Sequence, residues 1–156
     1  LQNVRKSWEE RANYFSLYPP NDHKFAVLKK NFDFNFLEII KSNPQIEFKI
    51  IFPPHSILFF KGYEERQVYN DILKFKEYIL NTLIAYPNLE IYDFQIVDKI
   101  TTDLSNYKDL NHYHQMINTW MLSRMQNNEF LVTSKNIEEH LQMLKKQVEN
   151  FHLDQF

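Results

Sequence analysis

Asp109 and His112 are the pair of residues in this chain best suited to catalysis. They stand three residues apart, just before a segment with the apolar periodicity of a helix. A carboxylate that hydrogen-bonds an imidazole fixes the tautomer of the ring and stabilises the imidazolium that forms when the ring accepts a proton. The spacing therefore predicts a histidine general base that activates an attacking hydroxyl, as nucleophilic hydrolases require.

The same pair has a purely structural interpretation. A loop aspartate often caps the helix that follows it, which would leave His112 as an exposed residue near the helix start. Short motifs of this kind also recur by chance. The context favours chemistry, because the pair lies in a polar loop between a predicted parallel strand and a helix, and both interpretations stay open.

Two other arrangements are possible around His112. Together with His114 and Asp109 it could bind a metal, since imidazole and carboxylate suit zinc. Residues two apart at a helix start face different directions, however, and we expect no metal and no cofactor. Asp103 could replace Asp109 as the partner of the ring, although its spacing matches no pattern that we know.

A nucleophile on a strained turn is not visible in the sequence. Gly62 is the single glycine, whereas a dinucleotide fingerprint, a P-loop and a nucleophile elbow each need at least two. Cysteine is absent, which excludes disulfides, thiolate zinc sites and Cys nucleophiles. Ser56 follows a predicted strand, but the prolines at 53 and 54 predict an extended turn, so it is a weak candidate.

The composition limits the classes of function. The net charge of −2 leaves no excess of Lys and Arg for a nucleic-acid surface. No run of about 18 apolar residues is present, so we expect no transmembrane segment. The hydrophobic share of 44% in 156 residues suits one domain or most of one. The chain begins at Leu1 without a methionine or a signal peptide, and we expect it to be the later part of a larger domain.

Apolar periodicity predicts an α/β chain. Helices are expected over residues 4–14, 22–42, 62–86, 114–126 and 136–151, and the 22–42 helix could be broken in its middle. Strands are expected over 47–52 and 89–94, with a short edge strand over 130–133. The strand, helix and strand between 47 and 94 form a βαβ unit with parallel strands. Functional groups gather beyond the carboxyl ends of such strands, and the loop from 95 to 112 leaves one of these ends.

Some finer expectations concern single side chains. The buried stripe of the 22–42 helix should contain Phe25, Leu28, Phe32, Phe36, Ile39 and Ile40, and Met116, Ile117 and Trp120 should share a core-facing side of the next-to-last helix. Ser134 should cap the last helix.

From about residue 32 to residue 140, the chain resembles the C-terminal half of SGNH/GDSL-type hydrolases. The likeness rests on Asn43-Pro44 before the first strand, the segment FPPHS at 52–56 after it, YDF at 92–94 and DLNHY at 109–113. It is most similar to the cell-envelope branch that modifies surface polysaccharides or teichoic acids, which includes alginate O-acetylation and D-alanine transfer proteins.

The resemblance implies a fold and a site. The fold would be a three-layer α/β/α sandwich with a parallel sheet, with residues 1–156 as its C-terminal portion and residues 1–21 of uncertain packing. Asp109 and His112 would be the Asp and His of a Ser-His-Asp triad. Further binding residues would be Pro54, His55, Ser56 and Asn111. The serine and the oxyanion-hole glycine and asparagine of the family have no match here, since they lie in earlier blocks.

The function implied is hydrolysis or transfer of an acyl ester on an envelope carbohydrate, in a periplasmic or other extracytoplasmic location. The partners would be an acylated carbohydrate or a small ester, together with the missing N-terminal part or a second copy of the chain, and no nucleic acid. A fold alone does not establish a function. The alternatives are a non-catalytic interaction or assembly domain that retains the fold without a nucleophile, and an unrelated α/β binding module.

Overall fold

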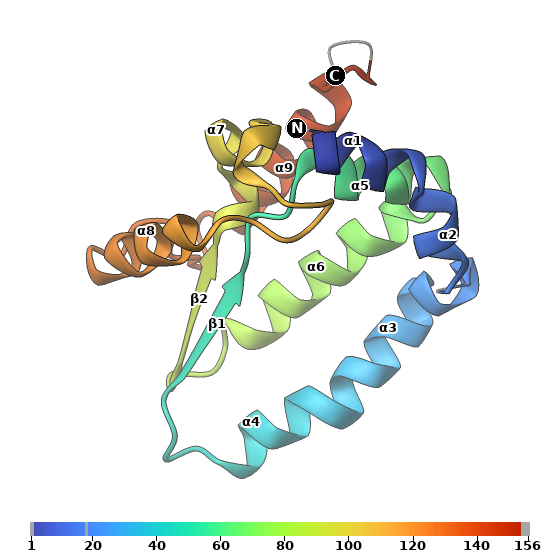
Figure 1. Ribbon diagram of the computed structural model, residues 1–156. Helices are drawn as coiled ribbons and strands as arrows, with labels where there is room; N and C mark the ends of the chain where they lie inside the picture. The colour runs from blue at the N-terminus through green and yellow to red at the C-terminus, as the bar shows by residue number, and fades with distance from the viewer. Residues whose placement is uncertain (1, 18, 154–156) are drawn as a thin grey trace.

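Helices make up most of the described chain, and a two-stranded parallel sheet lies among them (Figure 1). The structure is a computed structural model that describes residues 2–17 and 19–153. The α-helices are α1 (Gln2–Glu9), α2 (Arg11–Ser16), α3 (Phe25–Phe32), α4 (Glu38–Ser42), α5 (Ile57–Glu65), α6 (Tyr69–Leu83), α7 (Asp98–Thr101), α8 (Gln115–Gln126) and α9 (Ile137–Asn150). Shorter turns of helix are η1 (Pro20–His23), η2 (Asp33–Leu37), η3 (Phe94–Ile96) and η4 (Leu104–Asn106), and the strands are β1 (Phe48–Phe52) and β2 (Leu89–Asp93).

The sheet has the parallel pairing that the sequence predicts. β1 and β2 pair residue by residue, from Phe48 opposite Leu89 to Phe52 opposite Asp93. On its other edge, β2 meets the segment predicted as a short strand over 130–133, but the pairing is a single antiparallel bridge between Tyr92 and Leu131. Phe130 has φ 62°, outside the extended region, and the strand therefore cannot continue.

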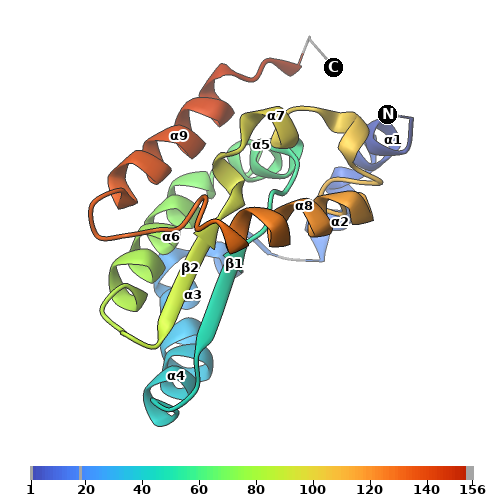
Figure 2. The ribbon, with the colours of Figure 1, turned by 90° about the vertical axis from the view of Figure 1, so that its left-hand side faces the viewer.

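Helices lie on both sides of this sheet. α3 and α6 are on one side and α8 is on the other (Figures 1 and 2). Successive strand residues point to opposite faces, and two neighbours of β2 follow this rule. Ile91 packs with Leu80 and Leu83 of α6, whereas Tyr92 packs with Ile117 and Met121 of α8. Both faces of β2 are therefore buried.

The predicted helix over 22–42 contains a π-helical turn, η2, between α3 and α4. Phe32 is buried, and the next buried side chains are Leu37 and Ile40. The interval of five residues from Phe32 to Leu37 is one π turn, which rotates the later residues around the axis. Phe36 and Ile39, expected on the buried stripe, are instead 37% and 54% exposed, so that part of the prediction was wrong.

The single helix predicted over 62–86 is two helices, α5 and α6. Gln67, with φ 58°, adopts the left-handed conformation between them. The amide of Val68 donates to the carbonyl of Tyr63 (3.0 Å) and the amide of Gln67 to that of Glu64 (2.9 Å), which is a Schellman motif. The usual sign of this motif is glycine at the left-handed position. Because glutamine stands there, no residue type in this segment indicates the break.

Two smaller expectations about the last helices were also wrong. Asn136 rather than Ser134 precedes α9, and its side-chain oxygen accepts the amide of Thr133 at 2.7 Å. On α8, Ile117 is buried and Trp120 packs against the same apolar cluster, as predicted, but Met116 is 81% exposed and Met121 takes the core position one turn after Ile117.

Candidate active site

The segment that follows β1 is bonded to the loop that carries Asp109 and His112. The hydroxyl of Tyr107 donates to the carbonyl of Pro54 at 2.7 Å. The hydroxyl of Ser56 donates to the carbonyl of Leu110. These bonds join residues more than 50 positions apart and fix the loop at the carboxyl end of β1.

Asp109 holds the ring of His112 in one orientation. The Nδ1 of His112 lies 2.7 Å from Oδ2 and 2.9 Å from Oδ1 of the carboxylate. Oδ1 also accepts the backbone amides of Asn111 (3.1 Å) and His112 (2.9 Å). The turn is closed by the amide of Lys108, which donates to the carbonyl of His112 at 2.8 Å. The carboxylate therefore shapes the loop and orients the imidazole at the same time, so the structural and the chemical interpretations both apply.

The protonation of Asp109 suits the role of an orienting carboxylate. Burial alone would raise the pKa of Asp109, but the hydrogen bonds from the amides of His112 and Asn111 and from the imidazole outweigh it and hold the pKa below its ordinary value. An ionised Asp109 requires the proton of a neutral His112 to sit on Nδ1. Nε2 then has the lone pair that can accept a proton. The side chain of His112 is 72% exposed, so a substrate can reach it.

Ser56 is placed behind this loop. It is completely buried, and its hydroxyl is occupied by the carbonyl of Leu110. A nucleophile must be exposed on a strained turn. The observed geometry gives Ser56 a supporting bond instead.

His55 is also a supporting residue in this geometry. Its half-buried ring packs at a tilt against the ring of Phe59, with 4.7 Å between the ring centroids. Burial lowers the pKa of His55 and outweighs the opposing effect of its hydrogen bond to the backbone of Asn111. A neutral imidazole therefore lies beneath the backbone of the Asp109–His112 loop.

A cavity of about 280 Å³ lies over the Asp109–His112 pair. Its walls are Ser7, Glu10, Asn13, Asp109, Leu110, Asn111 and His112. Of the four predicted binding residues, Asn111 lines this cavity, whereas Pro54, His55 and Ser56 contact the loop from behind. The contribution of α1 and α2 was missed, because it depends on a tertiary contact between residues about 100 positions apart.

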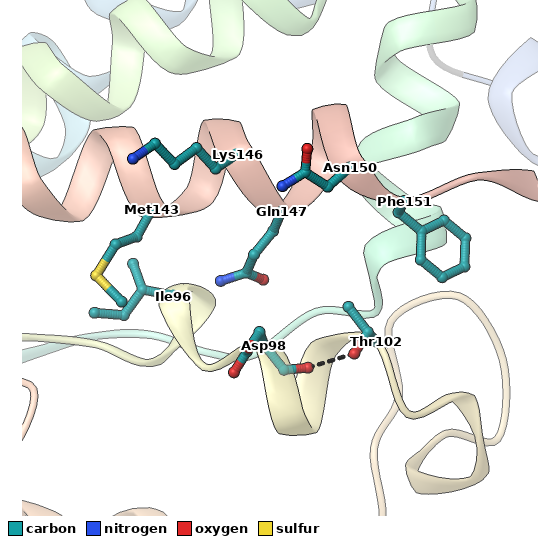
Figure 3. Close-up of a pocket in the computed structure, with 8 residues that line it drawn as sticks. All are labelled: Ile96, Asp98, Thr102, Met143, Lys146, Gln147, Asn150 and Phe151. Carbon is teal, nitrogen blue, oxygen red and sulfur yellow. Dashed lines mark hydrogen bonds between the residues drawn. The ribbon is translucent and has the colours of Figure 1, made fainter.

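A larger cavity of about 610 Å³ lies between α7 and α9, away from this pair (Figure 3). Figure 3 shows the side chain of Gln147 reaching from α9 toward α7. Its Oε1 accepts the hydroxyl of Thr101 at 2.6 Å, and its buried Nε2 has no partner among the described residues.

A buried ionic cluster lies at the carboxyl end of β2 and was not predicted. The ammonium of Lys76, on α6, lies 2.7 Å from Oδ2 of Asp93, and the Nδ1 of His140, on α9, lies 3.2 Å from the same oxygen. Lys76 also donates to Oε1 of Gln95 at 2.9 Å. Burial alone would raise the pKa of Asp93, but Lys76 and His140 hold it below its ordinary value. The cluster ties α6, β2 and α9 together.

The other candidates around His112 have different surroundings. Asp103 accepts the amide and the hydroxyl of Ser105, at 3.0 and 2.6 Å, and so caps η4. Within residues 2–17 and 19–153, no group of three or more His, Cys, Asp or Glu is placed to hold a metal ion. The helices in these residues are also too short or too polar to cross a membrane.

Comparison of the chain with protein-family models, with curated proteins and with solved structures finds no match. The functional proposal is therefore built on the site itself.

Proposed function

We propose that Asp109 and His112 are two members of a Ser-His-Asp triad in an SGNH-like acyl ester hydrolase or acyltransferase. The observation that carries this proposal is the geometry of the pair. The carboxylate lies 2.7 Å from Nδ1 of a ring that is itself 72% exposed. This is the arrangement in which Nε2 acts as a base toward a hydroxyl outside the loop.

In the proposed mechanism, Nε2 of His112 takes the proton of a serine hydroxyl as its oxygen attacks the ester carbonyl. The same proton then passes to the departing alcohol, and an acyl-serine remains. In a second step, the acyl group leaves the serine through attack by water in a hydrolase, or through attack by an acceptor hydroxyl in a transferase. Asp109 stays ionised throughout and stabilises the imidazolium.

The serine is proposed to come from a segment outside this chain. Ser7 lines the cavity, but it lies within the regular helix α1 and lacks the strained turn that exposes a nucleophile. Among the described strands, β1 pairs with β2 alone. Helices on both sides of this small sheet are compatible with a larger three-layer α/β/α sandwich that continues beyond β1.

The substrate class follows from the resemblance and from the lining of the cavity. Ser7, Asn13 and Asn111 offer hydroxyl and amide groups that can bind the hydroxyls of a sugar. We propose an acylated carbohydrate of the cell envelope, and with it an extracytoplasmic location.

The test uses the complete protein that carries this chain and a fluorophosphonate, which reacts with activated serines. We expect labelling of the wild type and its loss in His112→Ala. His114→Ala is the matched control, because His114 is exposed at the start of α8 and should leave labelling intact. A complete protein that is never labelled would support the second candidate, an interaction or assembly domain. That candidate is favoured by one observation, the buried and bonded hydroxyl of Ser56.

A further inference from the structure

We propose that α1 and the start of α2 form the substrate-selecting wall of this site, with Glu10 favouring esters that carry a cationic or neutral group over anionic esters. This inference rests on the proposed function, because only an enzyme has a substrate to select. The preference of the cavity for one sign of charge can be measured by binding alone, without catalysis.

The wall is firmly attached to the rest of the molecule. Val4 and Trp8 of α1 are buried in the same apolar cluster as Leu110, the residue next to Asp109. Arg11 lies over the ring of Trp8, with its guanidinium carbon 4.0 Å from the ring centroid. The same guanidinium donates to both carboxylate oxygens of Glu65 on α5, at 2.6 and 2.8 Å. A bidentate Arg–carboxylate pair of this kind fixes orientation as well as distance.

The side of this wall that meets the cavity is polar. Ser7, Glu10 and Asn13 follow one another at intervals of three, which places them on one flank of a helical path. The amide of Asn13 donates to the carbonyl of Glu10 at 2.9 Å, so the path stays helical across the junction of α1 and α2. Across the cavity lie Asp109, Asn111 and His112. A volume of about 280 Å³ is just below the range of sites for drug-sized ligands, and suits one small ester group or sugar unit.

The charges around the cavity do not cancel. Asp109 is paired with His112, which leaves the carboxylate of Glu10 as the second acidic group of the lining. Lys6 lies 3.9 Å from Glu10, but the two side chains are 72% and 58% exposed, and such a pair is weak. Arg11 is engaged by Glu65. The cavity therefore repels an anionic group and attracts a cationic one.

The experiment compares three acetate esters of similar shape with different charge. The cationic ester is acetylcholine, the neutral one 3,3-dimethylbutyl acetate, and the anionic one 4-acetoxybutanoate. Binding to the 156-residue chain is followed by the NMR amide shifts of Asn111 and His112 at low ionic strength. We expect acetylcholine to bind about threefold more tightly than the neutral ester, as befits a single partly exposed charge, and the anionic ester to bind most weakly. High salt should reduce the differences.

Two variants decide whether Glu10 is responsible. Glu10→Gln should reduce the differences among the three affinities, because Asp109 is then the one acidic group left in the lining, while Glu9→Gln should leave the differences as in the wild type, because Glu9 is an exposed neighbour outside the cavity lining. Equal affinities in the wild type, differences in Glu10→Gln as large as those in the wild type, or an absence of shifts at Asn111 and His112 would each overturn the proposal. Failure of the proposed function has a different signature: serine labelling that survives His112→Ala, with the charge order still dependent on Glu10.

Discussion

The ammonium of Lys76 lies 2.7 Å from the carboxylate of Asp93, with the two side chains 5% and 0% exposed. The pair joins the middle of α6 to the last residue of β2, at the edge of the sheet from which the chain continues toward the candidate site. His140 adds a third contact from α9. Two charges this deeply buried stabilise each other, because removal of either leaves the other buried without the opposite charge that balances it.

We therefore expect Lys76→Met to destabilise the fold by about 3–5 kcal/mol, the usual cost of an orphaned buried charge. Urea unfolding followed by circular dichroism measures this loss. Lys49→Met is the control, since Lys49 forms an ion pair with Glu90 of similar length, 2.6 Å, on the exposed surface, and its loss should matter little. Similar effects of the two substitutions would contradict a special role for the buried pair.

The ionised carboxylate of Asp109 should contribute to the pH dependence of the stability of the fold. Its pKa is lowered in the folded chain, so the unfolded chain binds protons more readily. The stabilisation is complete above the unfolded value, close to 3.8, and is lost as the pH falls through the lower folded value. We expect the melting temperature of Asp109→Asn to fall less steeply below pH 4 than that of the wild type. The difference should correspond to the titration of one carboxyl group. Parallel pH profiles for the two proteins would show that the carboxylate has no preferential bonds in the folded state.

Sequence patterns succeeded where the determining residues are close together in the chain. Asp109 and His112 meet within a single turn, and short runs of β-branched and aromatic residues mark the two five-residue strands locally. The break at Gln67 was missed, and the irregularity in the middle of the 22–42 helix was expected only as a break and not as a π turn, for a different reason. Both depend on how neighbouring elements pack, and neither has a distinctive residue type, such as glycine, to mark it.

Contacts between residues that are far apart in the sequence could not be predicted from local patterns. Glu10 reaches the cavity because Trp8 is buried beside Leu110, a contact between distant segments. One feature of the sequence does indicate the Lys76–Asp93 pair. Lys76 lies four residues from the buried Leu80, on the apolar side of α6, where a charged side chain requires a buried partner. Which residue would supply that partner depended on the pairing of β1 with β2.

Asp109→Asn in the complete protein should reduce turnover of an acetyl ester by about 10³- to 10⁴-fold if the pair works as a triad. The asparagine oxygen can still accept the two backbone amides, so the loop should survive, but the amide group no longer enforces the tautomer with the proton on Nδ1. Steady-state kinetics with p-nitrophenyl acetate measures the effect. Asp103→Asn is the matched control, because Asp103 caps η4 and does not contact His112. A loss of turnover below tenfold in Asp109→Asn would argue against the triad.

The substitution Ser56→Ala distinguishes a structural role of Ser56 from a role as the nucleophile. The substitution removes the hydrogen bond to the carbonyl of Leu110 and leaves that buried acceptor unpaired, which should cost roughly 1–3 kcal/mol of stability. The loop would loosen beneath Asp109, so turnover in the complete protein should fall severalfold while fluorophosphonate labelling persists. Complete loss of labelling in a variant that still shows a cooperative unfolding transition would make Ser56 the nucleophile. Ser105→Ala provides the comparison, because its hydroxyl bonds to Asp103 at an exposed turn, and both its stability and its turnover should stay close to those of the wild type.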